Sequence, residues 1–200
     1  IYQDGVEIAQ TAGTTFTIRG LTNGQTYAFQ VAAQNRAGHG PNSTAVASTP
    51  MSAPDAPTMA EATARGSSVL LAWIAPASDG GSSITGYDVY WSAAGAGSWI
   101  AFERLPASAF STTVTGLEPD TTYYFSVRAI NDIGEGALSV AIKATTSPAF
   151  VPLSGRVLDG EGNGLVGITI TLENGNTAKT NADGLFTIMA SQGEHALTFS

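Results

Sequence analysis

One stretch of this chain occurs twice at a fixed distance, and that repeat limits the folds open to it. The first copy spans residues 20–40 and the second spans residues 116–136. The matching pairs share one offset, 117 − 21 = 96, and are Leu21/Leu117, Tyr27/Tyr123, Phe29/Phe125, Val31/Val127, Ala33/Ala129, Asn35/Asn131, Gly38/Gly134 and Gly40/Gly136. A period of this length predicts tandem domains. Within each copy the apolar residues fall on every second position, which predicts strands with one buried face.

The second copy has further strand signals before it. The apolar run at residues 69–73 predicts a second strand with Trp73 in its core, and Tyr87, Val89 and Trp91 alternate along a third. Gly80 and Gly81 allow a tight connection between these strands. The domain is large enough to bury a core without disulfides, and the chain has no cysteine.

The spacing Leu117-x-Pro119-x-Thr121-x-Tyr123 and the alternation that follows it resemble the fibronectin type III family. In such an immunoglobulin-like sandwich, a tyrosine near the start of the sixth strand turns its hydroxyl back onto upstream backbone. The resemblance places Tyr123 and Tyr27 in that role. We therefore expect residues 55–146 to form one complete fibronectin type III domain.

Residues 1–50 match only the later part of the same pattern. Ile1 and Tyr2 correspond to Val89 and Tyr90, so we expect the C-terminal part of a fibronectin type III domain without its first two strands. Uncovered sheet faces and edges are unfavourable in a free domain, which favours a piece of a longer polypeptide. Donation of the missing strands by a neighbouring subunit is the alternative.

A different pattern follows residue 152. Three spaced motifs, Gly155-x-Val157-x-Asp159, Gly164-x-x-Gly167-x-x-Ile170 and Thr180-x-x-Asp183-Gly184-x-Phe186, resemble the carboxypeptidase regulatory-like family. This resemblance implies a small, non-catalytic, transthyretin-like sandwich over residues 153–200, cut short at its end. Family members usually have Pro where this chain has Leu165 or Val166, and Tyr where it has His195. Residues 146–152 contain two prolines and predict a short, stiff spacer. The fold class expected for the whole chain is all-β.

Charge excludes one class of partner. The net charge is −8, from eight basic and sixteen acidic residues, and the basic residues are scattered. Phosphate binding needs clustered Lys and Arg, so nucleic acid is not an expected partner. No apolar run is long enough to cross a bilayer, so no membrane insertion is expected in this segment.

We expect no catalytic, cofactor-binding or metal-binding residues. The chain has no Gly-x-Ser-x-Gly elbow. The five carboxylates of the second repeat region occur in or near predicted loops, where a solvated surface is the simplest interpretation. They are Asp79, Asp88, Glu103, Glu118 and Asp120.

Two loops resemble cation sites but are better explained as turns. Asp159-x-Glu161-x-Asn163-Gly164 has the opening of a calcium loop, yet its twelfth position is Ile170, not a carboxylate. Asn181-x-Asp183-Gly184 is also a turn pattern. The two histidines lack zinc-ligand spacing. We expect His39 in a turn of the first repeat and His195 at the start of a strand.

Exposed aromatic residues are the best candidates for contacts. The distance from Tyr90 to Leu117 exceeds that from Tyr2 to Leu21 by 27 − 19 = 8 residues, and this longer region contains Trp99, Phe102 and Phe110. If solvent-facing, Trp99 or Phe102 would suit a glycan or another subunit, whereas a strand pair that covers its own core is the alternative. Asn42-Ser43-Thr44 is an N-glycosylation sequon.

These observations predict a non-catalytic spacer or adhesive segment of an extracellular modular protein, such as a surface layer, filament or adhesin. Its partners would be neighbouring domains of the same polypeptide, with other copies or surface glycans as further candidates. The alternative is a set of accessory modules in a secreted polysaccharide-degrading enzyme whose catalytic domain lies elsewhere. Strand exchange in a fibre is a third possibility.

Overall fold

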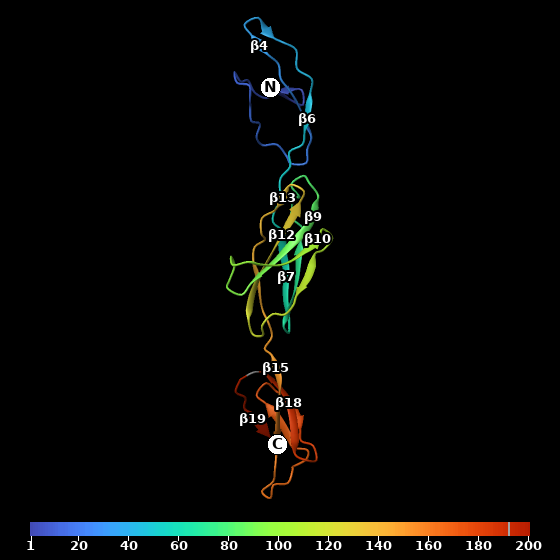
Figure 1. Ribbon diagram of the computed structural model, residues 1–200, viewed down its shortest axis with the longest axis vertical. Coiled ribbons are helices and arrows are strands. Elements are labelled where there is room, and N and C mark those ends of the chain that lie inside the picture. The colour runs from blue at the N-terminus through green and yellow to red at the C-terminus, as the bar shows by residue number, and fades with distance from the viewer. Residues whose placement is uncertain (192) are drawn as a thin grey trace. The chain divides into compact units, whose positions relative to one another are not determined.

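All regular secondary structure in the described part of the chain is β-strand, which confirms the predicted all-β fold class (Figure 1). The computed structural model describes residues 1–191 and 193–200. The sheets fall into three stretches of sequence: residues 1–50, residues 52–147, called the middle domain below, and residues 148–200, called the C-terminal segment.

The middle domain has two sheets. One has the order β11-β8-β7, from β7 (Thr58–Arg65), β8 (Ser68–Ile74) and β11 (Ser111–Val114). The other has the order β10-β9-β12-β13, with β14 also paired to β12, from β9 (Ile84–Ser92), β10 (Ile100–Pro106), β12 (Thr122–Asn131), β13 (Gly134–Glu135) and β14 (Ile142–Thr145). These strands lie in the teal to orange part of Figure 1.

The core of the middle domain follows from strand periodicity. Side chains on alternate positions point to one face, and the apolar set of each strand is buried there. The buried members are Val69, Leu71 and Trp73 of β8, Tyr87 and Val89 of β9, and Phe125, Val127 and Ala129 of β12. The ring centroids of Trp73 and Tyr87 lie 5.7 Å apart, a tilted aromatic contact. The predicted strand at residues 69–73 and its core tryptophan are therefore confirmed.

The predicted tyrosine corner is present in both copies. Tyr123 accepts a hydrogen bond on its hydroxyl from the Glu118 backbone N–H at 3.0 Å. Tyr27 accepts one from the Thr22 N–H, also at 3.0 Å. Each bond satisfies an upstream backbone donor, so each tyrosine fixes the chain reversal before its strand.

Residues 1–50 form short strands. One sheet has the order β2-β1-β3-β6, and β4 pairs with β5. The strands are β1 (Tyr2–Gln3), β2 (Val6–Glu7), β3 (Tyr27–Gln30), β4 (Gln34–Asn35), β5 (Gly38–His39) and β6 (Val46–Ser48). Tyr2 pairs with Gln30, and Tyr90 pairs with Ser126. Because 30 + 96 = 126, Tyr2 occupies the ladder position of Tyr90.

The two copies also share individual hydrogen bonds. The Val31 N–H donates to Ser43 Oγ at 3.1 Å, and the Val127 N–H donates to Ser139 Oγ at 3.0 Å. Burial differs sharply, however: Val31 is 58% exposed and Val127 is 0% exposed. Residues 1–50 contain no counterpart of β7 and β8, so their inner sheet face lacks the cover that β8 gives the middle domain.

The C-terminal segment has one two-stranded and one three-stranded sheet. β15 (Phe150–Arg156) pairs with β18 (Leu185–Ser191), and β16 (Thr169–Leu172) lies between β17 (Thr177–Lys179) and β19 (Leu197–Phe199). Its core consists of Ile170, Leu172, Phe186, Ile188 and Ala190, with Leu153, Val157, Ala178 and Leu197 packed against it. Alternation along β16 and β18 places these residues on the inner faces.

The spacer predicted at residues 146–152 is shorter than expected. The Thr146 N–H bonds to the Thr121 carbonyl at 3.0 Å, and the Ser147 N–H also bonds to a backbone carbonyl, at 3.1 Å. Pro152 lies inside β15, in register with Met189. Residues 148–149 alone connect the last bonded residue of the middle domain to β15, because backbone pairing extends into the predicted spacer from both sides.

Candidate interaction surface

A compact group of charged residues lies on the face of the β10-β9-β12-β13 sheet that faces away from the core. Asp88 sits in β9, where alternation turns it away from the buried Tyr87 and Val89. In the ladder, Arg104 of β10 pairs with Asp88 on one side, and Arg128 of β12 pairs with it on the other. Asp88, Tyr90, Arg104, Arg128 and Glu135 are called the Asp88 cluster below.

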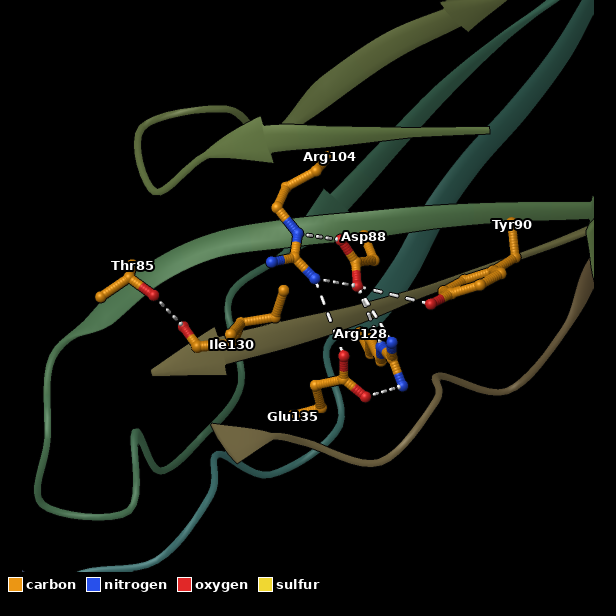
Figure 2. Close-up of polar contacts among 7 residues, drawn as sticks. All are labelled: Thr85, Asp88, Tyr90, Arg104, Arg128, Ile130 and Glu135. Carbon is orange, nitrogen blue, oxygen red and sulfur yellow. Dashed lines mark hydrogen bonds and ion pairs between the residues drawn. The ribbon is translucent and has the colours of Figure 1, made fainter. Parts of the chain in front are cut away.

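Hydrogen bonds and ion pairs join the residues of this cluster (Figure 2). Arg104 holds Asp88 with two bonds, from Nε to Oδ1 at 2.7 Å and from Nη2 to Oδ2 at 3.0 Å. Arg128 donates to Oδ2 from Nε at 3.2 Å and from Nη2 at 3.1 Å. Arg128 Nη1 also lies 2.6 Å from Glu135 Oε2, and its guanidinium lies 5.2 Å from the centroid of the Tyr90 ring. Paired bonds from planar guanidinium groups fix orientation as well as charge.

This environment corrects the prediction for Asp88. The residue is only 7% exposed and lies in the middle of a strand, so it is not a solvated loop carboxylate. Burial alone would raise the pKa of Asp88, but the hydrogen bonds and positive charges of Arg104 and Arg128 outweigh it and hold the pKa below its ordinary value. Asp88 is therefore an ionised structural anchor, and its lowered pKa does not favour a role as a general acid.

The cluster is balanced in charge, and part of it is open to solvent. Its two guanidinium groups and two carboxylates balance, and the Asp88 oxygens are already bonded. The Arg104 side chain is nevertheless 62% exposed and that of Glu135 50% exposed. Tyr and Arg are enriched among residues that dominate binding energy at protein interfaces. The arrangement is a preorganised polar patch with two accessible charged ends.

The other four carboxylates of the predicted set are exposed, as expected: Asp79, Glu103, Glu118 and Asp120. Glu103, however, lies within β10 and not in a loop. Sequence reasoning missed Arg104, Arg128 and Glu135. The sequence did carry a signal for Asp88 and for Arg128, because each occupies an outward position in a strand whose alternate positions are apolar. Glu135 joins the cluster from β13 because the chain turns back after β12. The local sequence pattern does not predict that path.

The three aromatic candidates differ in how far they are exposed. Trp99 and Phe102 are half-buried, as expected for a strand pair that covers its own core. Phe102 lies at a bulge in β10, between the residues that pair with Tyr90 and Val89. Phe110 is 48% exposed, with its ring centroid 6.0 Å from that of Tyr87. The contact with Tyr87 joins Phe110 to the edge of the core of the middle domain, although about half of its surface stays exposed.

Both loops considered as cation sites are closed by their own hydrogen bonds. Asp159 accepts from the Glu161 N–H at 2.9 Å and the Asn163 N–H at 2.8 Å. Asn181 Oδ1 accepts from the Asp183 and Leu185 N–H groups, both at 2.9 Å. Such bonds are typical of turns stabilised by Asp and Asn. Within residues 1–191 and 193–200, no three His, Asp or Glu side chains are grouped so as to hold a metal ion.

The histidines lie apart, and one of them stands in an arrangement that resembles a catalytic triad. Both positions differ from the prediction: His39 lies exposed in β5 and not in the turn before it, and His195 lies in the loop before β19 and does not start a strand. His195 Nδ1 donates to Glu173 Oε1 at 2.6 Å, and Nε2 lies 3.5 Å from Ser191 Oγ. Nε2 is, however, 2.6 Å from the Ser191 carbonyl oxygen, to which it must donate. It therefore has no lone pair to accept the hydroxyl proton, and a nucleophilic serine is not supported.

A hollow of about 1390 Å³ lies in residues 1–50, and its lining includes the apolar residues Phe16, Ile18, Phe29 and Val31 beside polar ones. Phe29 and Val31 correspond to Phe125 and Val127, which are core residues of the middle domain. The hollow is thus the uncovered inner face of the first copy and not a ligand pocket. Asn42, of the glycosylation sequon, is exposed. No helix that could span a membrane was found among the described residues.

Comparison with known proteins identifies one module and a range of contexts. Residues 52–145 match the family model of the Fibronectin type III domain. Exoglucanase B of Cellulomonas fimi is 34% identical over 194 residues, which cover 92% of this chain and 17% of that protein. Chitinase A1 of Niallia circulans is 34% identical over 157 residues, covering 74% of this chain and 21% of that protein.

A human protein, Cell adhesion molecule-related/down-regulated by oncogenes, is 43% identical over 90 residues, covering 44% of this chain and 7% of that protein. The chain thus spans about a fifth or less of the length of these relatives. The relatives with similar sequences thus include proteins named as enzymes and a protein named as a cell adhesion molecule. Residues 52–145 carry a fibronectin type III domain within an all-β chain.

Proposed function

We propose that this segment is a non-catalytic, semi-rigid spacer in a large extracellular modular protein, such as a surface layer, filament or adhesin. It would consist of the C-terminal part of one fibronectin type III domain over residues 1–50, a complete one over 55–146, and a carboxypeptidase regulatory-like sandwich over 153–200. The observation that carries the proposal is how little unbonded backbone remains between these three parts.

At the first junction, backbone hydrogen bonds approach from both sides. The Pro50 carbonyl accepts from the Gly24 N–H at 2.9 Å, and the Ser52 N–H donates to the Gly80 carbonyl at 2.9 Å. Met51 alone lies between these bonded residues. At the second junction, Pro148 and Ala149 lie between the bonded Ser147 and the first residue of β15. Connections this short, with a proline fixing φ, restrict bending.

Spin-label distance measurements test this stiffness directly. The chain has no cysteine, so single pairs can be introduced at exposed positions: Thr14→Cys with Ser108→Cys for the first junction, and Ser108→Cys with Asn174→Cys for the second. The control is the same pair in a variant with six Gly and Ser residues inserted after Met51 or Ala149. Narrow distributions that broaden on insertion support a spacer. Native distributions as broad as those of the insertion variants overturn it.

The second candidate function is a set of accessory modules in a secreted polysaccharide-degrading enzyme. It is favoured by the match to Exoglucanase B, which covers 92% of this chain. Intact mass and peptide mapping of the source-derived protein separate the two functions. A carboxylate-bearing catalytic domain in the same polypeptide would favour the enzyme, whereas further sandwiches or a wall anchor would favour the surface spacer. A stiff segment is compatible with both, so this test is independent of the distance measurements.

A further inference from the structure

His195 lies between two hydrogen-bond acceptors in the C-terminal segment. Its Nδ1 is 2.6 Å from Glu173 Oε1, and its Nε2 is 2.6 Å from the Ser191 carbonyl oxygen. The other oxygen of the same carboxylate, Glu173 Oε2, accepts from the Ala196 N–H at 3.0 Å. The His195 side chain is 12% exposed and that of Glu173 is 48% exposed, so the pair is sheltered from water mainly on its histidine side.

The two acceptors, Glu173 and the Ser191 carbonyl, determine how many protons the His195 ring must carry to bond to both. A backbone carbonyl oxygen and an ionised carboxylate can only accept hydrogen bonds. A neutral imidazole has one N–H, whereas an imidazolium has two. Both short contacts can therefore be hydrogen bonds only while His195 is protonated. Loss of that proton would leave a nitrogen lone pair facing an oxygen atom at 2.6 Å.

The contacts of His195 connect the ends of two neighbouring strands. Glu173 follows β16 directly, and His195 lies shortly before β19. β19 has three residues and pairs with β16 through Leu172↔Leu197, Thr171↔Thr198 and Ile170↔Phe199. Leu197 also packs against the core, but the residues directly before it are held by the bonds from Glu173 to His195 and Ala196. These bonds therefore help to hold the start of this short strand in place.

We propose that Glu173, His195 and Ser191 form a proton-dependent latch, which holds the start of β19 against the end of β16 when His195 is charged and releases it when His195 is neutral. The charged groups around the ring are few. Glu173 faces it from the turn after β16, and Glu194 is an exposed neighbour on the loop itself. β15 contributes only Val151, Pro152 and Leu153 to the cavity of about 220 Å³ that His195 also lines.

The charge environment agrees with this geometry. The Glu173 carboxylate and then the Ser191 carbonyl raise the pKa of His195 above its ordinary value of 6.5. The His195 bond lowers the pKa of Glu173 below its ordinary value of 4.5. The latch therefore contributes fully below pH 6.5 on the histidine side and is lost as pH rises through the raised pKa of His195. On the glutamate side it contributes above pH 4.5 and is lost as pH falls through the lowered pKa of Glu173.

Amide hydrogen exchange and imidazole ¹⁵N shifts test the latch in the intact chain. Protection factors, corrected for intrinsic exchange, should fall about tenfold at the Ala196 amide, which bonds to Glu173, and at the Thr198 amide, which pairs with Thr171 in the ladder, as the ring titrates. In Glu173→Gln and His195→Gln, protection at these amides should be low at every pH. His39→Gln, which removes the other histidine, should leave the transition unchanged.

Two results would overturn the latch. The first is ¹⁵N shifts of a neutral imidazole at about pH 5.5, where the acceptor geometry requires a cation. The second is a His195 ring that titrates while protection at Ala196 stays constant in the native chain, because a merely structural contact would behave in that way. If that result is found, the latch is rejected even if Glu173→Gln and His195→Gln lose amide protection at Ala196. Folding of each variant is checked independently from the core amides of Ile170 and Ile188, which lie away from the loop.

Discussion

Replacement of Asn131 by alanine should destabilise the middle domain by about 4 kcal/mol. Asn131 is 4% exposed. Its Nδ2 donates to the Ser52 carbonyl at 2.8 Å and the Asp79 carbonyl at 2.7 Å, and its Oδ1 accepts from the Ile133 N–H at 2.9 Å and the Gly134 N–H at 3.1 Å. Each hydrogen bond contributes about 1 kcal/mol net, so four give about 4 kcal/mol. That is a large share of the roughly 5–15 kcal/mol expected for a domain.

Urea unfolding followed by tryptophan fluorescence measures this effect selectively. All three tryptophans, Trp73, Trp91 and Trp99, lie in the middle domain. With an m-value of about 1–2 kcal/mol per molar urea, the midpoint of Asn131→Ala should fall by about 2–4 M. Asp132→Ala, at the exposed next position, is the matched control and should change stability by no more than about 0.5 kcal/mol.

Asn131→Asp separates the donor from the acceptor half of the side chain. The substitution keeps Oδ1 but turns a carboxylate oxygen toward the Ser52 and Asp79 carbonyls. Repulsion between these oxygens should make it at least as destabilising as alanine. The reasoning is refuted if Asn131→Ala lies within about 1 kcal/mol of the native protein, since the four bonds would then contribute almost nothing net.

Three further predictions concern the corner, the Asp88 cluster and the core. Tyr123→Phe leaves the Glu118 N–H without its partner and should cost about 1–2 kcal/mol in urea unfolding, whereas an unchanged midpoint would rule out a structural role for the corner. Because the pKa of Asp88 is lowered, its contribution is present above its ordinary value of 3.8 and lost as pH falls through the lower folded value. Asp88→Asn should therefore unfold more readily than the native protein at neutral pH, with the difference shrinking in acid; a difference constant with pH would contradict this origin. Trp73 Nε1 is buried without a hydrogen-bond partner among the described residues, so Trp73→Phe removes no hydrogen bond. The substitution should therefore lower the free energy of unfolding by only about 1 kcal/mol, measured by thermal unfolding followed by circular dichroism. A loss above about 3 kcal/mol would show that the volume of the tryptophan ring dominates.

Much of the fold was predictable because strand alternation is a local property. The apolar positions of residues 69–73 and 123–129 and the two corner tyrosines were assigned correctly, since each depends on neighbours within a few residues. The prediction that Asp88 is a solvated carboxylate was wrong for a related reason. Acidic residues are usually solvated, and that tendency was given more weight than the outward position of Asp88 between apolar neighbours in a strand.

The start of β15 shows a second limit. Two prolines at residues 148 and 152 predicted a spacer, because proline lacks the N–H that a sheet ladder uses. β15 pairs with β18 and with no further strand in the described part of the chain. Pro152 can therefore lie in β15, because an edge strand tolerates a missing donor on its unpaired side. Whether a strand is an edge depends on sheet order, which proline content does not reveal.

Asn35 and Asn131 show why a sequence repeat does not by itself give equal roles to matching residues. Both accept a turn N–H on Oδ1, from Ala37 at 2.8 Å and from Ile133 at 2.9 Å, because that partner lies two residues along the chain and is repeated with it. Only Asn131 also binds carbonyls at residues 52 and 79, which lie 131 − 52 = 79 and 131 − 79 = 52 positions away. These partners lie outside the repeated stretch at residues 116–136, so the repeat itself did not predict them. A repeat therefore predicts the contacts that each copy makes with itself, and the structure is needed for contacts with the rest of a domain.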